Sequence, residues 1–303
     1  MRKASSPPRR STVFSACAVM RNLTLRCRVS EISVTWHRLG RKVRLVLFSA
    51  WLRIWPANVR ALYEINFNGF TVGSFEFQSQ AESQSYTLTG NAHLSVLLGA
   101  FSWAGSTRSF GMIVNQAPKP ASFSFDFKSN LRAGSTKIGF SDDAVTNIMN
   151  VPPMVTSAPI IPLREHHLKG VVDPLSAIMM LSRNTAADPC DRRIAIFDGK
   201  ERFDLLFSRK GQMRVTEQAP SGQPGVAHVC RVRYLPIAGH KIDGDTKFMA
   251  ANDAIEVALR PVPSANVFVP YQISIPTLAG SATIVSKRVE IVSPGKPQIA
   301  MLY

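Results

Sequence analysis

Short runs of alternating apolar and polar residues, separated by turn residues, fill most of the chain after residue 61. Tyr63, Ile65 and Phe67 precede the turn dipeptide Asn68-Gly69, and further phenylalanines two residues apart follow it. A spacing of two places side chains on one face of a strand, and Asn-Gly between such runs is a strong hairpin signal. About a dozen strands of this kind predict a mainly β, antiparallel fold over residues 62–303, in one domain.

One helix is predicted between the strands, and we expect the sheet to curve around it. Asp173 is suited to cap a helix N-terminus, and Pro174 can occupy the first helical position, where its missing N–H is no loss. The residues that follow are apolar on nearly all sides, which is typical of a buried helix. We therefore predict a buried helix over Asp173–Arg183, wrapped by one large curved antiparallel sheet.

A proline-rich segment precedes this helix. Residues Asn150–Pro162 contain four prolines, which remove backbone donors and favour extended conformations. The segment is also apolar, so we expect it to lie against the domain as a strap or lid rather than to link two domains. The candidate interaction residues of the strap are Pro152, Pro153, Met154, Ile160 and Ile161.

The N-terminal part of the chain resembles a secretion signal. Residues 41–61 combine a basic start, a short apolar core and the small-residue site Val59-Arg60-Ala61, so we predict a signal peptide with cleavage after Ala61 and a periplasmic protein. The apolar core is too short to span a bilayer. A signal peptide normally begins the protein, but this one begins at residue 41. We therefore expect that the translation start has been placed too far upstream, or that residues 1–40 are a disordered extension.

The strongly basic composition does not predict a nucleic-acid partner. The chain has a net charge of +16, but residues 1–61 hold 13 of its 36 Lys and Arg and only 1 of its 20 Asp and Glu. Residues 62–303 therefore carry 23 basic and 19 acidic residues, a net charge of +4. A polynucleotide-binding domain would keep a basic face in its folded part.

Four cysteines are present, of which Cys17 and Cys27 precede the predicted cleavage site. Cys190 and Cys230 remain as an even pair in a chain predicted to be exported, where a disulfide is the expected state. Two buried thiols or a redox-active pair are the alternatives at this point, although no Cys-x-x-Cys motif supports the second.

No catalytic, metal-binding or cofactor motif is found. His166 and His167 are adjacent, which does not suit one metal ion, and we interpret them as surface residues before the helix. We expect no cofactor and no enzymatic activity. The alternative is an envelope hydrolase that uses two acids of the cluster at residues 188–204, which consists of Asp188, Asp191, Asp198, Glu201 and Asp204. Mixed charges around Asp198-Gly199 are more typical of a solvated hairpin tip.

Aromatic residues are concentrated in the first half of the predicted domain, among them Phe75, Trp103, Phe125 and Phe127. A rolled sheet of a dozen strands has room for an apolar interior that holds a ligand. An ordinary hydrophobic core is the alternative.

Several stretches together resemble a known family. These are residues 63–77, 97–111, 171–181, 188–205, 230–240 and 270–282, with sequences such as YEINFNGFTVGSFEF and DPCDRRIAIFDGKERFDL. They are similar to the exported alphaproteobacterial proteins grouped as domain of unknown function 3108, and the resemblance covers most of residues 62–303.

The resemblance implies a periplasmic protein whose sheet forms a β-spiral or open barrel around the helix Asp173–Arg183, with a disulfide between Cys190 and Cys230. It also implies a likeness to lipoprotein carriers of the Gram-negative envelope, although the activity of the family is itself undefined. No lipid-anchor cysteine lies near Ala61. We therefore expect a non-enzymatic periplasmic protein that supports the envelope and binds a lipid-like ligand or a protein partner through an apolar cavity or the strap.

Overall fold

The structure is a computed structural model that describes residues 58–82, 84–96, 99–153, 159–183 and 188–303. The chain separates into two units, residues 1–50 and 51–303, and every described residue belongs to the second. Residues 1–40, most of the predicted signal peptide and Met154 of the predicted strap therefore lie outside the described residues.

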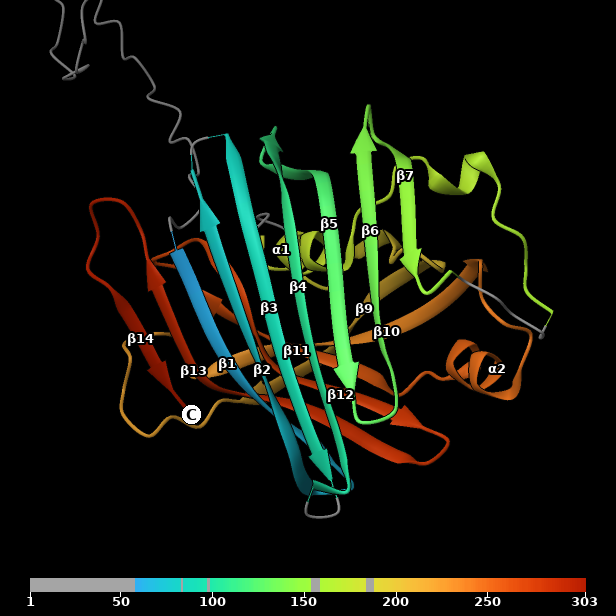
Figure 1. Cartoon of the computed structure of the whole chain (residues 1–303). Helices are drawn as coiled ribbons and strands as arrows, with labels where there is room; N and C mark the ends of the chain where they lie inside the picture. The colour runs from blue at the N-terminus through green and yellow to red at the C-terminus, as the bar shows by residue number, and fades with distance from the viewer. Residues whose placement is uncertain (1–57, 83, 97–98, 154–158, 184–187) are drawn as a thin grey trace, which may run out of the picture. The chain divides into compact units, whose positions relative to one another are not determined.

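The described residues form one 14-stranded sheet in which every paired strand is antiparallel to its neighbour (Figure 1). The strands are β1 (Asn58–Phe67), β2 (Phe70–Ala81), β3 (Ser85–Val96), β4 (Phe101–Val114), β5 (Ala117–Ser129), β6 (Ala133–Ser141), β7 (Ala144–Val151), β8 (Arg192–Phe197), β9 (Arg202–Arg214), β10 (Val226–Ala238), β11 (Ile255–Val262), β12 (Val267–Thr277), β13 (Gly280–Val292) and β14 (Ile299–Leu302). The mainly β prediction is confirmed.

The sheet consists of two meanders joined in the middle. The strand order is β7-β6-β5-β4-β3-β2-β1-β13-β12-β11-β10-β9-β8, and β14 pairs with β13. Pairing of β1 with β13 joins residues far apart in the chain, such as Asn58 and Val292. The end strands β7 and β8 do not pair with each other, so the sheet is open rather than a closed barrel.

Strand β1 begins earlier than the expected domain start at Leu62. Asn58 to Ala61 already pair with β2 and β13, and the side chain of Ala61 is buried between Phe77 and Val289. The hairpin that follows is as predicted, because Asn68 and Gly69 both have positive φ angles, 49° and 86°. Two consecutive residues of this kind define the hairpin turn that matches the twist of the strands.

The predicted helix is α1 (Pro174–Leu181), and both of its ends are capped by side chains. Asp173 Oδ1 accepts from the N–H groups of Leu175 and Ser176, both at 3.0 Å. At the other end, the guanidinium of Arg192 donates to the carbonyls of Met180 (2.7 Å), Leu181 (3.2 Å) and Arg183 (2.5 Å). A helix of eight residues is marginal on its own, so these caps and its burial hold it in place.

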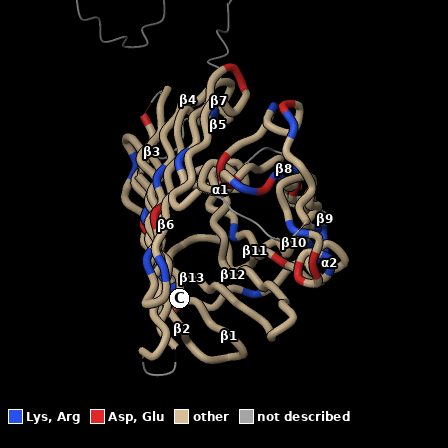
Figure 2. Tube along the Cα trace, turned by 45° about the vertical axis from the view of Figure 1, so that its right-hand side comes forward, with Lys and Arg blue, Asp and Glu red and all other residues tan. Residues whose placement is uncertain are grey.

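Helix α1 lies between the two meanders, in contact with β3, β4 and β5 on one side and with β8 on the other (Figure 2). Leu175 and Met179 pack into the core of the first meander, together with Leu88 and Phe123. Ala177 and Leu181 pack with residues of the second meander, among them Ile194, Phe207 and Val257. The helix therefore supplies a hydrophobic surface to both meanders.

A buried polar cluster fixes the helix N-terminus to the sheet. Asp173 is fully buried, and its Oδ2 accepts from the hydroxyls of Ser176 (2.5 Å) and Ser109 of β4 (2.8 Å). Tyr86 of β3 shares a hydrogen bond of 2.8 Å with the Ser176 hydroxyl. Burial raises the pKa of the Asp173 carboxyl, against the effect of these hydrogen bonds.

The segment before α1 connects the two end strands of the open sheet. Gly170 N donates to Asp143 O at 2.7 Å, and Lys169 forms a β-bridge with Ala144 at the start of β7. Two residues later, Val172 N donates to Ala195 O (2.9 Å) and Val172 O accepts from Phe197 N (3.0 Å), both in β8. Residues 169–172 therefore span the gap between β7 and β8.

Two short helical elements were not predicted. One is the 3₁₀ helix Glu165–Leu168, and the other is α2 (Gly244–Ala251), whose N-cap Asp243 accepts from Thr246 N at 2.9 Å. Helix α2 has no buried residue and contacts β10 and β12. Its weak amphipathic pattern explains why the sequence did not reveal it.

We expect Asp173→Ala to lower the free energy of unfolding by about 2–4 kcal/mol, because it removes an N-cap and the buried acceptor of two hydroxyls. The matched control is Asp243→Ala, which removes the cap of the exposed helix α2 and should cost about 1 kcal/mol. Urea unfolding measures both. Equal losses in the two variants would contradict a role of the buried cluster beyond capping.

Candidate functional site

Cys190 and Cys230 form a disulfide, and both residues are fully buried. Cys190 lies just before β8 and Cys230 lies within β10, so the bond spans β9, which runs between these strands. The cystine packs in the same cluster as Ala177 and Leu181 of α1. The bond thus ties the second meander together beneath the helix, and the pair favoured by the sequence is the pair that the structure joins.

The acids of the 188–204 cluster serve as local structural acceptors. Asp204 is fully buried and forms ion pairs with Arg202 and Arg193, whose Nε lies 2.7 Å from the carboxylate. Asp188 accepts from Cys190 N at 2.9 Å, and Glu201 accepts from the Tyr234 hydroxyl at 3.2 Å. An acid–base pair for hydrolysis would have to converge on a cleft. The lining of neither cavity described below contains an Asp or a Glu.

The hairpin at Asp198-Gly199 was expected to be a solvated tip, and this expectation is wrong. Gly199 is buried, and a Cβ on it would lie 2.2 Å from the Thr136 side chain of β6. Its carbonyl accepts from the Asn150 side chain of β7 at 3.1 Å. The turn therefore packs against the far end of the sheet, and glycine is required there by its φ of +98° and by the close approach.

The histidines do not form a metal site in the described part of the chain. His166 and His167 lie in the 3₁₀ helix with their rings 4.0 Å apart, and His167 Nδ1 accepts from Arg164 N at 3.1 Å. Among the described residues, no group of three His, Cys, Asp or Glu side chains is placed to hold a metal ion. Within the same residues, no helix has the length and hydropathy needed to cross a membrane.

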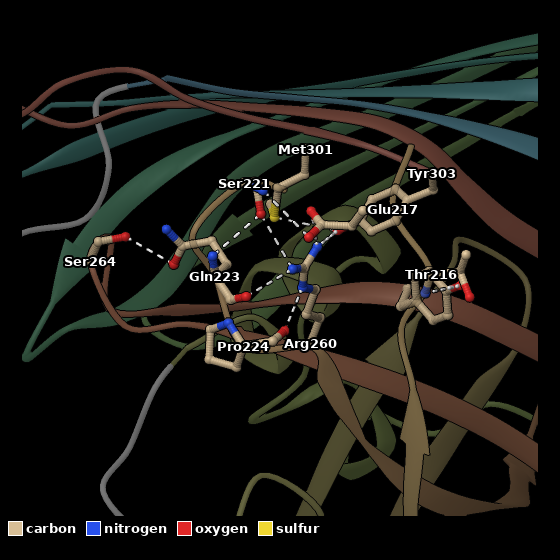
Figure 3. Close-up of polar contacts among 10 residues, drawn as sticks. Thr216, Glu217, Ser221, Gln223, Pro224, Arg260, Ser264, Met301 and Tyr303 are labelled. Carbon is tan, nitrogen blue, oxygen red and sulfur yellow. Dashed lines mark hydrogen bonds and ion pairs between the residues drawn. The ribbon is translucent and has the colours of Figure 1, made fainter. Parts of the chain in front are cut away.

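Arg260 of β11 lies at the centre of a network of hydrogen bonds. Its partners come from residues 217–224 and from the last residues of the chain (Figure 3). Arg260 is fully buried. Its Nε donates to Pro224 O (3.0 Å), Nη1 to Glu217 (2.8 Å) and the Tyr303 hydroxyl (3.0 Å), and Nη2 to Ser221 (3.3 Å) and Gln223 O (3.2 Å).

These contacts use all five N–H groups of the guanidinium, so Arg260 keeps no donor for a ligand. The hydrogen bond from Arg260 holds the pKa of Glu217 below its ordinary value. Gln218 adds two bonds to the chain end, from its N–H to Leu302 O (3.0 Å) and from its side chain to Tyr303 O (2.9 Å). The network is a structural clamp. Sequence reasoning missed it, although a lone arginine in the apolar run of β11 was a usable signal.

A small apolar cavity lies between α1 and the sheet. Its volume is about 40 Å³, and its lining includes Tyr63, Phe77, Met179 and Phe268. Sites for drug-sized ligands have volumes of roughly 300–1,000 Å³. Side chains therefore fill the interior at this point, as in an ordinary core.

A larger groove, of about 560 Å³, crosses the ends of β2 to β5. Ser74, His93, Ala104 and Lys128 are cross-strand neighbours in its lining and share one face of the sheet. Trp103 belongs to the opposite face, where its ring packs with those of Phe125 and Phe127, with centroids 6.3 and 6.5 Å away. The groove is open, and most of its lining surface is apolar, although polar side chains such as His93 and Lys128 contribute to it.

The predicted strap is anchored in its second half. Ile161 N donates to His240 O (3.1 Å) and Ile161 O accepts from Gly239 N (2.6 Å), while Ile160 forms a β-bridge with Lys241. Both isoleucines are half-buried. They are bound to the segment after β10 and do not offer a free surface.

The first half of the strap continues an exposed apolar surface that begins in β7. The exposed fractions are 36% for Ile148, 51% for Met149 and 53% for Val151. Pro152 and Pro153 follow directly and are exposed as well. We call these five residues the β7 surface. The sequence predicted its prolines but not its strand residues, because their exposure depends on β7 being an end strand of the sheet.

Comparisons with known proteins give a family and a distant structural neighbour. The family model described as "Protein of unknown function (DUF3108)" matches residues 62–286. A crystal structure of a beta-barrel-like protein of the domain of unknown function DUF1849 from Brucella abortus has a TM-score of 0.48 and 10% sequence identity, covering 79% of this chain and 100% of that chain. No curated protein matches the chain.

We expect Arg260→Ala to lower the free energy of unfolding by about 3–5 kcal/mol, because it leaves Glu217 without its buried partner. The control is Arg288→Ala, which removes a surface ion pair with Glu290 and should change stability by about 0–1 kcal/mol. Chemical denaturation of both variants provides the comparison. A loss for Arg260→Ala no larger than that of the control would contradict the clamp.

Proposed function

The chain belongs to the DUF3108 family of proteins of unknown function, and we propose that it is an exported, non-enzymatic envelope protein that binds a protein partner through the β7 surface. Two observations support export to the periplasm. Residues 41–57, which precede β1, have the basic start and short apolar core of a signal peptide. The buried disulfide between Cys190 and Cys230 is of the kind that persists in oxidising compartments.

The β7 surface carries the binding proposal. Isolated exposed apolar residues are common on proteins, but here they make up five of the six residues 148–153, on both faces of the end of β7 and in the prolines after it. Strand β7 also contains no charged residue. An uncharged strand with exposed apolar side chains at the end of a sheet is typical of a site where another protein binds.

The interior supports a protein partner over a lipid-like ligand. A cavity of about 40 Å³ has room for little more than ordered water. The titratable side chains of Asp173, Asp204 and Arg260 are fully buried. Each is hydrogen-bonded to other side chains of the same protein. These groups stabilise the fold, which supports a binding role rather than the hydrolase alternative.

The test is site-specific photo-crosslinking in the native organism. A photoreactive amino acid at Met149 should give a discrete crosslink to an envelope protein in the periplasmic fraction, with Cys190 and Cys230 protected from alkylation until reduction. The matched control is Met112 of β4, a methionine of similar exposure, 45%, on an interior strand. Equal crosslinking from both positions, or a protein that stays in the cytoplasm with free thiols, would contradict the proposal.

A further inference from the structure

The backbone of β7 offers a second kind of recognition, besides the side chains of the β7 surface. Strand β7 ends the sheet, and β6 pairs with only one of its edges. Among the described residues, backbone contacts reach the other edge only near its start, where Lys169 and Gly170 meet Ala144 and Asp143. Beyond this point, the N–H and C=O groups directed away from β6 have no backbone partner within the described part of the chain, and they form an open row.

The other terminal strands described in the sheet, β8 and β14, have no comparable long unpaired edge. The outer edge of β8 is bonded to Val172 through two backbone hydrogen bonds. Strand β14 is only four residues long. Proteins commonly protect an edge with charged residues, prolines or bulges. In β7 the bulge lies near the start, opposite Gly139 and Phe140, and the prolines come after Val151. The stretch Asn147–Val151 between them is regular and uncharged.

Exposure on both faces of β7 distinguishes a missing strand from a flat docking patch. Ile148 and Met149 are adjacent in the strand, so their side chains point to opposite faces of the sheet, and both are exposed. A partner lying flat on one face would cover only one of them. An added strand alongside β7 would place its own side chains beside both.

We propose that β7 binds an extended polypeptide segment of low charge by strand addition, which would continue the sheet past β7. This inference rests on the proposed function and specifies how the partner is bound. The chemistry of the edge selects this occupant, because a row of backbone donors and acceptors is matched by another extended backbone. Alternating apolar residues in the segment would pack beside Ile148 on one face and Met149 and Val151 on the other.

A labelled peptide tests the proposal with the intact protein. The probe is a fluorescent peptide with the sequence of β6, Ala133–Ser141, which already pairs with β7 along its other edge. Fluorescence anisotropy should show saturable binding to the wild-type protein. Lysine at an edge blocks strand addition, so Ile148→Lys and Met149→Lys should each weaken binding about tenfold or more. Met112→Lys, on an interior strand, should leave the affinity unchanged.

A second control changes the peptide instead of the protein, so its result does not depend on whether the protein variants fold. The same peptide with N-methyl groups on its backbone nitrogens keeps its side chains but loses its donors, and it should not bind. Equal binding of the methylated peptide, or equal affinity of Met149→Lys and Met112→Lys, would overturn strand addition. Light scattering measures whether the protein is a dimer. A wild-type dimer that is lost in Met149→Lys, together with no binding of the peptide, would show that a second copy of the protein occupies the edge of β7. That result would overturn the proposal.

The two proposals can fail separately. A crosslink from Met149 in the envelope without peptide binding would leave the proposed function standing and show that the partner contacts side chains only. Peptide binding without any crosslink would support the open edge and contradict the proposed function.

Discussion

The structure depends on the segment Lys169–Leu181, because it holds together a sheet that does not close on itself. The sheet ends at β7 and β8, and this segment bonds to both end strands before it forms α1. The helix then supplies apolar side chains to the two meanders. Asp173 fixes the point where the segment becomes a helix, and its buried bonds to Ser109 and Ser176 fix the helix to the first meander. An open sheet without such a segment would leave the inner faces of both meanders exposed to water.

Three buried charged side chains of the interior stabilise this architecture. Asp173, Asp204 and Arg260 are buried, and each is bound to groups of its own chain, as buried charged and polar groups must be. The disulfide adds a covalent link within the second meander. The unpaired backbone groups lie at one end of the sheet. Among the described residues, no strand pairs with the outer edge of β7 beyond Ala144. Function is therefore sought at the edge of the sheet and not in its centre.

Local patterns allowed much of this fold to be predicted. The Asn68-Gly69 turn, the N-cap Asp173 and the pairing of Cys190 with Cys230 follow from near neighbours or from a short count of cysteines. The packing of Gly199, the Arg260 clamp and the open edge of β7 could not be predicted in the same way. Each depends on which strands become neighbours, and that is decided by the pairing of β1 with β13 and by the bridges of residues 169–172. Strand alternation is the same whether a strand lies inside a sheet or at its end.

Hydrogen exchange of individual backbone amides tests the central claim most directly. The amides of β7 between Asn147 and Val151, after the bulge, should alternate, with those bonded to β6 exchanging slowly and those directed away from β6 exchanging quickly. The amides of β4, which has a neighbour on each side, should all be slow. Uniform slow exchange along β7 would show that its outer edge is already covered, and it would contradict the account of a sheet held together by α1 and open at β7.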